Sequence, residues 1–576
     1  MAFSQTDALA KEYFKKGAFE KALLEYKKLY KSSPSNINYI YPIITAYQEL
    51  EQYNEAQAFL LQLMERINYP AFLVELGYNY QLKGELEKAQ AQYQKALLAI
   101  DERASNVFSV GRSFQNHSLL NEAITAYKKA MVINPNYNFN VQLAQIYGEQ
   151  GLIDKMFDSY LDFAATNRIV LGDVKRAINE FITEDAYNEN NVLFRKTLLK
   201  KMQQEPDVLW NELLSWLYVQ QKDFKKAFIQ EKAIYNRELR SLHRIEELAA
   251  VAANDGEAKV AEEIYNYIIE TAQDAGTQLN AHYNILQLKV KHTNNYSDIK
   301  KQYQSLLETF GDRTETFNLQ ISYAHFLAFY LSETHQAIAL LESMLEQPLT
   351  PMEKAQVKLE LGDILVVQEQ FNKALIYYTQ VQRNLKNSTL SQQARFKVAK
   401  TSYYKGDFKW AESQLKILKS STSQLIANDA LDLKLLITDN KYEDSLQTAL
   451  KKYAKADLLA FQNRNDEAIK LLDKILNEHK TEPIIAQTLF KQAQLFELKK
   501  EFNKAQANYK VIVENYREGI LVDDALFYLA QLCEKELNQP ERAKQLYETI
   551  VFEHADSIYF VDARKRFRAL RGDFIK

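Results

Sequence analysis

A short motif recurs along this 576-residue chain at a nearly constant interval. It first occurs at residues 17–22, GAFEKA, and its last position, Ala22, has equivalents at intervals of 34, 33, 34 and 33 residues. These equivalent positions are Ala56, Ala89, Ala123 and Met156. A fixed period of 20 to 50 residues indicates stacked copies of one supersecondary unit. Each copy then buries its apolar side against its neighbours rather than in a central core.

The residues around each marker position predict two helices joined by a tight turn. Leu9 and Tyr13 share one face of a first helix, Gly17 ends that helix, and Ala22 and Tyr26 begin the apolar face of a second. The marker is small because the two helices approach most closely there. A tyrosine lies four residues after several markers and is predicted to fill the gap to the next hairpin: Tyr26, Tyr93, Tyr127 and Tyr160.

This pattern resembles the tetratricopeptide-repeat family, and the resemblance covers nearly the whole chain. It implies an all-α fold, an α-solenoid of about 14–15 helical hairpins that form a right-handed superhelix. Composition agrees, because 14 glycines and 9 prolines leave little material for strands or long loops. We therefore expect almost no β-structure.

The marker spacing divides the chain into four parts. Residues 1–164 hold five regular repeats, 165–210 a degenerate hairpin where the array can bend, and 211–350 divergent repeats. Residues 351–576 hold repeats of 37 to 38 residues and a C-terminal capping helix. A second irregular point is expected near residues 420–423, followed by a truncated hairpin between Gln424 and Tyr453.

The last repeats carry a narrower resemblance. The stretches 522–530, 554–558 and 561–564 resemble the long repeats of bacterial periplasmic tetratricopeptide proteins, of the outer-membrane-assembly and Tol-Pal-associated types. This resemblance implies a role at the cell envelope. The chain departs from the pattern at His554-Ala555, where proline is usual, and it has no N-terminal lipidation cysteine, so lipoprotein anchoring is unsupported.

Two features bear on the compartment. Residues 2–5, AFSQ, look like the end of a cleaved secretory signal, with small residues three and one before a cut ahead of Gln5. We expect a periplasmic protein, with an ordinary cytoplasmic N-terminus as the alternative. No apolar stretch reaches the roughly 20 residues of a membrane-spanning helix.

The sequence shows no pattern typical of catalysis, a cofactor site or a metal site. The eight histidines include no pair at one-turn helical spacing and no cysteine partner. Gly148 and Gly151 belong to a repeat turn that lacks the Lys-Ser/Thr of a phosphate loop. Cys533, the single cysteine, lies in an apolar helix and is predicted to be a buried, inert thiol. The net charge of -3 gives no general attraction to nucleic acid.

Candidate binding residues follow from the family resemblance, which implies that the first helix of each hairpin lines a concave groove. Counting fifteen and eleven residues back from the markers gives five aromatic or arginine candidates: Tyr41, Tyr78, Phe108, Arg112 and Trp216. These residue types are enriched at interaction hot spots. The same count gives Val74, and it does not give the lysines and asparagines with which some family members hold a C-terminal carboxylate. The alternative is that some of these rings pack between helices as core.

The last helix is strongly basic. Its cationic residues are Arg564, Lys565, Arg566, Arg568 and Arg571. They provide either the polar outer face of a terminal repeat or a docking site for an acidic partner or an anionic lipid surface.

The sequence therefore predicts a noncatalytic scaffold that binds protein partners through its concave groove, in the bacterial periplasm or at the cell envelope. The alternatives are an accessory subunit of an envelope machine, a glycan-binding helical array, or a cytoplasmic adaptor. No cofactor, metal or nucleic acid is expected.

Overall fold

The computed structural model describes residues 2–572 apart from 239–240, 294, 312, 419–422 and 441–446. Over these residues it contains 32 α-helices, three short 3-10 helices and no strand. Twenty-eight of the α-helices form fourteen packed pairs of consecutive helices. Helices α11 and α12 both pack on α10 rather than on each other, and α25 and α32 lie outside the pairs. The prediction of an all-α solenoid of helical hairpins is confirmed.

The chain forms two compact units, Met1–Arg237 and Glu238–Lys576. Their boundary falls at the end of α14, inside the segment 211–350 that the marker spacing groups as divergent repeats. The four-part division by spacing stays a prediction.

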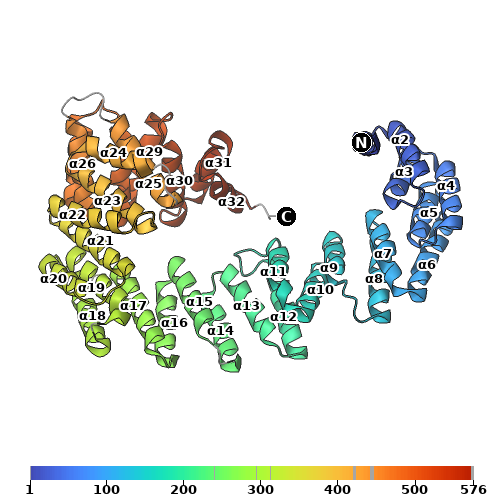
Figure 1. Ribbon diagram of the computed structural model, residues 1–576, viewed down its shortest axis with the longest axis horizontal. Helices are drawn as coiled ribbons and strands as arrows, with labels where there is room; N and C mark the ends of the chain where they lie inside the picture. The colour runs from blue at the N-terminus through green and yellow to red at the C-terminus, as the bar shows by residue number, and fades with distance from the viewer. Residues whose placement is uncertain are drawn as a thin grey trace. The chain divides into compact units, whose positions relative to one another are not determined.

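The first unit is a succession of antiparallel helix pairs, coloured blue to green in Figure 1. Its helices are α1 (Ala2–Lys15), α2 (Phe19–Ser32), α3 (Ile37–Glu49), α4 (Tyr53–Arg66), α5 (Ala71–Leu82), α6 (Leu86–Glu102), α7 (Val107–Asn116), α8 (Leu120–Ile133), α9 (Asn140–Glu149), α10 (Ile153–Thr166), α11 (Leu171–Asn179), α12 (Glu189–Gln204), α13 (Val208–Gln220) and α14 (Phe224–Glu238).

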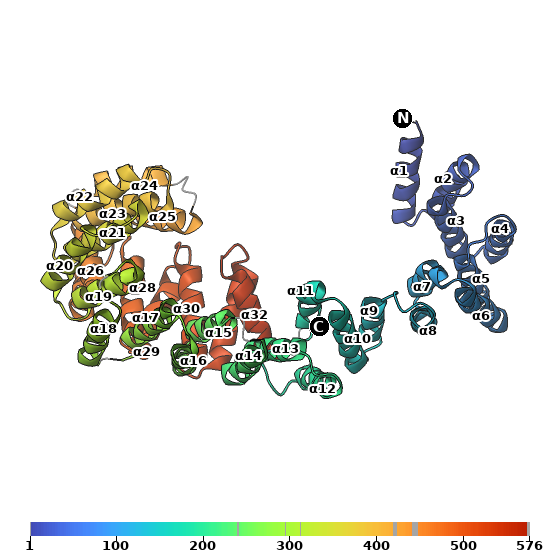
Figure 2. The same ribbon diagram turned by 60° about the horizontal axis from the view of Figure 1, so that its bottom comes forward.

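The second unit continues the same construction, coloured green to red in Figures 1 and 2. Its helices are α15 (His243–Asn254), α16 (Ala258–Thr271), α17 (Ala275–His292), α18 (Tyr296–Phe310), α19 (Phe317–Phe329), α20 (Thr334–Leu345), α21 (Pro351–Val367), α22 (Phe371–Asn384), α23 (Thr389–Tyr404), α24 (Phe408–Leu418), α25 (Gln424–Asp439), α26 (Thr448–Phe461), α27 (Asn465–Glu478), α28 (Ile485–Leu498), α29 (Phe502–Asn515), α30 (Val522–Lys535), α31 (Pro540–Glu553) and α32 (Phe560–Arg571).

The marker positions form the core of each hairpin. Each lies on a second helix and is at most 2% exposed: Ala22, Ala56, Ala89, Ala123, Met156, Ala227, Ala261, Ile299, Ala337, Ala374, Ala411, Ala468, Ala505 and Ala543. In three hairpins the first helix presents a glycine to the ring that follows the marker by four residues. A Cβ atom at Gly77, Gly111 or Gly362 would lie within 2.7 Å of the tyrosine ring opposite. The contact therefore fixes the distance between the two helices.

The marker-linked tyrosines bind back to their own hairpin, which the sequence analysis did not predict. The Tyr93 hydroxyl donates to Gln81 Oε1 at 2.8 Å, and the Tyr127 hydroxyl donates to Gln115 Oε1 at 2.6 Å. Each acceptor belongs to the first helix of the same pair. The ring of Tyr93 also reaches Phe114 of the next hairpin, with 5.7 Å between centroids. The predicted filling of the gap between hairpins is thus only part of their role.

The turn inside the hairpins repeats the same backbone conformation along the chain, although the residue type at the turn varies. Five residues before the marker the backbone is left-handed, with φ between 51° and 90°, in thirteen hairpins. Five of these positions are glycines: Gly17, Gly84, Gly151, Gly256 and Gly406. The other eight are Glu51, Ser118, Lys222, Ser332, Glu369, Asn463, Lys500 and Asn538. A side chain costs about 1 kcal/mol or more in this conformation, so these eight turns are strained.

Substituting Lys500→Gly is expected to stabilise the α28–α29 hairpin by about 1 kcal/mol, because glycine adopts the left-handed turn without steric cost. The matched reverse change is Gly84→Ala, since nothing lies within 4 Å of its Cβ position and only backbone strain is added. That change should destabilise α5–α6 by about 1 kcal/mol. Hydrogen exchange of the hairpin amides measures both effects. Slower exchange of the α5–α6 amides in Gly84→Ala than in wild type would contradict the assignment of strain to a side chain at this turn position.

Longer first helices account for part of the longer period of the second unit. Helices α7 and α9 have 10 residues each, whereas α17 has 18 and α21 has 17. In the hairpins that begin with α19 and α28, whose first helices have 13 and 14 residues, the longer interval lies mainly in the connecting segments.

Helix α25 interrupts the pairing in the second unit. Its flanking residues 419–422 and 441–446, which include most of the predicted irregular point, lie outside the described residues. After it, α26 packs beside α23 and its end reaches back to earlier hairpins. The Phe461 ring lies 5.5 Å from the ring of Phe329, Gln462 Nε2 donates to the Val367 carbonyl at 3.0 Å, and Asn463 Nδ2 donates to the Phe329 carbonyl at 3.1 Å. The C-terminal ends of α19, α21 and α26 thus converge.

A buried carboxylate joins three hairpins at this place. Asp457 on α26 accepts from Lys400 Nζ of α23 at 2.6 Å and pairs with Lys491 Nζ of α28 at 2.7 Å. Burial alone would raise the pKa of Asp457, but the charges and hydrogen bonds of both lysines outweigh it and hold that pKa well below its usual range. The carboxylate is therefore ionised inside the protein.

Candidate functional site

The first helices of the N-terminal unit enclose a hollow of 570 Å³. It lies against α3, α5 and the end of α7, and we call it the α3–α7 hollow. Its lining residues are Tyr41, Thr45, Gln48, Glu49, Glu51, Tyr53, Glu75, Tyr78, Leu82, Asn116 and His117. Two of the five predicted groove residues, Tyr41 and Tyr78, come together here.

A buried carboxylate lines the hollow. Glu75 is only 2% exposed and accepts hydrogen bonds from Ser113 Oγ at 2.5 Å and from His117 Nε2 at 2.9 Å. It lies on α5 between the buried residues Val74 and Leu76, so the helix carries it inward with the core face. Its two hydrogen bonds join α5 to α7 and its C-terminal turn.

Aromatic rings line the sides of the hollow. The ring of Tyr78 stacks on the imidazole of His117, with centroids 3.9 Å apart and planes at 21°. Tyr41 is half-buried on α3, and burial, followed by the nearby charge of Glu75, raises the pKa of its hydroxyl far above the usual value. Tyr41 therefore remains a neutral hydrogen-bond donor in the physiological pH range.

One polar side chain in the lining is incompletely bonded. Gln48 on α3 is 6% exposed, and its amide nitrogen is buried without a hydrogen-bond partner. A buried donor left unpaired costs about 1 to 3 kcal/mol. The lining of the hollow thus carries a buried donor without a partner.

The remaining groove candidates lie outside the hollow. Phe108 and Arg112 are exposed on α7; Phe108 is 56% exposed, and its ring packs edge-to-face on Tyr137 at 5.2 Å. Trp216 on α13 is half-buried against Phe194, with centroids 6.2 Å apart. Val74 is fully buried, so the expectation that it faces the groove is wrong. The binding roles of the five candidates stay predictions.

Sequence reasoning missed Glu75, His117 and Gln48. A signal for Glu75 exists, because it is the one charged residue in the apolar run 71–76, AFLVEL. His117 and Gln48 carry no such signal, since their positions in the repeat are polar in other hairpins as well.

The basic helix α32 presents most of its cations to solvent. Arg564, Lys565 and Arg568 are exposed, while Arg566 pairs with Glu534 at 3.5 Å and the guanidinium of Arg571 lies 5.1 Å from the ring centre of Phe567. Phe567 is buried and joins the last hairpin to the core. Docking on an acidic or anionic surface stays a prediction.

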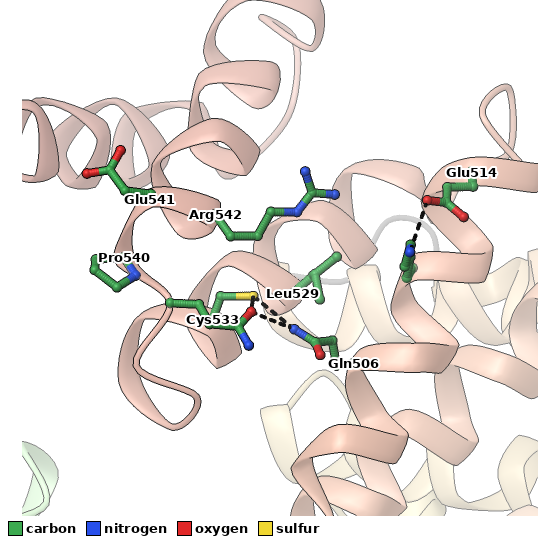
Figure 3. A pocket seen from close by; sticks show the side chains of 9 residues that line it. Gln506, Glu514, Leu529, Cys533, Pro540, Glu541 and Arg542 are labelled. Carbon is green, nitrogen blue, oxygen red and sulfur yellow. Dashed lines mark hydrogen bonds and ion pairs between the residues drawn. The ribbon is translucent and has the colours of Figure 1, made fainter.

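A second hollow, of 670 Å³, lies between α29, α30 and α31 and is shown in Figure 3. Cys533 is directed toward Gln506, whose Nε2 donates to Sγ at 3.5 Å. Cys533 is fully buried, as predicted, and burial raises the pKa of its thiol. The thiol is therefore protonated and a poor nucleophile.

Among the described residues, no group of three or more histidine, cysteine, aspartate or glutamate side chains is arranged to hold a metal ion. Within the same part of the chain, no helix combines the length and apolar character needed to span a membrane.

Comparison with known proteins identifies repeats at three places. Family models described as tetratricopeptide repeat match residues 70–100, 487–518 and 524–557. These stretches correspond to α5–α6, α28–α29 and α30–α31. No curated protein matches the chain.

Two solved structures resemble the chain along most of its length. One is the crystal structure of the APC/C hetero-tetramer Cut9-Hcn1, with 14% identity, a TM-score of 0.27, and coverage of 92% of this chain and 96% of that one. The other is titled as Naa15/Naa10 bound to HypK-THB, with 11% identity, a TM-score of 0.30, and coverage of 99% and 97%. TM-scores this low carry no information about activity or partners. The family matches and the hairpins together show that the chain contains tetratricopeptide repeats within an α-solenoid.

Proposed function

We propose that this protein is a noncatalytic scaffold that binds a protein partner through the first-helix face of its N-terminal unit. The observation that carries the proposal is the α3–α7 hollow, where Tyr41 and Tyr78 lie on neighbouring first helices. Phe108 and Arg112 are exposed on α7, the next first helix. Tetratricopeptide repeats generally act in protein interaction, which agrees with this use of the surface.

The geometry suits recognition of a segment of a partner. The rings are held by helices whose separation is fixed by core contacts, so little conformational freedom is lost when a partner binds. Tyrosine and phenylalanine offer large contact areas with few rotatable bonds, which favours them as anchors.

The test is affinity capture from native cells with the full chain, compared with a variant carrying Tyr41→Ala, Tyr78→Ala and Phe108→Ala. A matched control replaces three exposed aromatic residues elsewhere: Tyr187→Ala, Trp410→Ala and Phe552→Ala. We expect a stoichiometric partner with wild type and control, and at least about a hundredfold weaker binding to the hollow variant. Equal capture by all three proteins would place the binding site elsewhere.

We also propose that the protein acts in the bacterial periplasm or at the cell envelope. This proposal rests on the resemblance of residues 522–564 to periplasmic repeat proteins, and the family matches reach only the repeat class. The partner found in the capture experiment tests it, because a partner confined to the cytoplasm would contradict an envelope role.

A further inference from the structure

We infer that the α3–α7 hollow receives a lysine or arginine side chain from the segment that binds there. This inference rests on the proposed function, whose partner it characterises by charge.

The first argument is the charge of the lining. Three carboxylates, Glu49, Glu51 and Glu75, face one hollow, and no lysine or arginine is found among its described lining residues. Glu49 and Glu51 are exposed, and neither forms an ion pair with a described residue. The hollow is therefore an electrostatically negative site, and charge complementarity favours a cationic occupant.

The second argument is that Glu75 has no lysine or arginine partner among the described residues. A buried carboxylate is costly unless cations and hydrogen bonds replace its lost hydration. Asp457 in the other unit meets this requirement with two lysine ammonium groups. Glu75 has only the hydroxyl of Ser113 and the imidazole of His117, and no lysine or arginine partner in the described part of the chain. A guanidinium or ammonium group placed in the hollow would add a positive charge near this carboxylate.

The third argument concerns the groups that surround such a cation. Tyr41 and Tyr78 line the hollow, and an aromatic face attracts a cation that lies within about 6 Å. The hollow thus offers both carboxylates and aromatic rings to the side chain of a basic residue.

The test uses Nα-acetyl-arginine amide and Nα-acetyl-lysine amide as probes on the full chain, with binding measured by ligand-observed NMR. The neutral comparison is Nα-acetyl-citrulline amide, which has nearly the shape of the arginine probe without its charge. We expect at least one cationic probe to bind wild type about tenfold or more tightly than citrulline does. The tighter of the two cations identifies the preferred residue.

Glu75→Gln removes the charge of the side chain at nearly constant shape and should weaken binding of the cationic probe by about tenfold or more. The matched control is Glu87→Gln, an equal charge change at an exposed position of α6 outside the hollow. If Glu75→Gln fails to fold, the double variant Glu49→Gln, Glu51→Gln on the exposed rim tests the same charge. Equal binding of arginine and citrulline, or a cationic probe insensitive to these charges, would overturn the inference.

The outcomes separate this inference from the proposed function. If a partner needs Tyr41 and Tyr78 but binds the Glu75→Gln variant normally, the proposed interaction face stands and the proposed cation site is wrong. A cationic probe that depends on Glu75, without any partner that depends on the tyrosines, would retain the cation site and reject the scaffold proposal.

Discussion

Replacing Asp457 by alanine is expected to destabilise the second unit by about 3 to 5 kcal/mol, because two lysines then lose their shared carboxylate inside the protein. The carboxylate joins Lys400 of α23 and Lys491 of α28 across the interruption at α25. Hydrogen exchange should show a loss of protection in α26 of about two to four orders of magnitude. Protection in the N-terminal unit should not change.

The control for this change is Asp173→Ala on α11. Asp173 pairs with Arg176 at the surface, where both side chains are mostly exposed. Such a pair contributes at most about 1 kcal/mol. Similar losses of stability in the two variants would show that the Asp457 cluster is not a buried ionic contact.

The pH dependence follows from the lowered pKa of Asp457. Its folded pKa lies below the unfolded value of about 3.9, so its contribution is complete above that pH and is lost as the pH falls toward the folded pKa. The difference in stability between wild type and Asp457→Ala should therefore be constant near neutrality and shrink below about pH 4. Unfolding curves measured from pH 7 to pH 3 test this.

Gly362→Ala is expected to destabilise the α21–α22 hairpin by about 2 to 3 kcal/mol, although alanine ordinarily favours a helix over glycine. An added Cβ would lie 2.3 Å from Cε1 of Tyr378. The ring cannot easily retreat, because its hydroxyl donates to Asp363 Oδ1 at 2.6 Å and its residue is 1% exposed. The helices must then move apart at their closest contact.

Gly172→Ala on α11 is the matched control. It is also a helical glycine, but nothing lies within 4 Å of its Cβ position. That change should stabilise α11 by about 0.5 to 1 kcal/mol. Thermal unfolding followed by circular dichroism, with hydrogen exchange to locate the effect, measures both variants. A stabilising Gly362→Ala would show that the two helices have room to spare.

The repeat architecture could be predicted because it depends on local, repeated packing. Ala22 and its equivalents report the closest helix contact in nearly every hairpin, so one motif locates most of the core. The left-handed turn could be predicted only where glycine marks it, as at Gly84. At Lys500 the same backbone is imposed by the two packed helices, and residue type gives no sign of it.

The α3–α7 hollow could be predicted only in part. Tyr41 and Tyr78 follow from their positions in the repeat, whereas Glu75 meets Ser113 and His117 from the next hairpin. Such a contact depends on the rotation between successive hairpins, which the period does not give. The contact between the end of α26 and Phe329 could not be predicted at all, because it joins residues that are 134 apart in the sequence.

That return alters how the second unit can respond to force. A stack in which each hairpin touches only its neighbours extends like a spring, through small rotations at every interface. The hydrogen bonds of Gln462 and Asn463 to the ends of α21 and α19 connect hairpins that are not neighbours in the sequence. If the chain is pulled from points before α19 and after α27, these contacts bear part of the force. The hairpins between α19 and α26 therefore cannot separate until those side-chain contacts break.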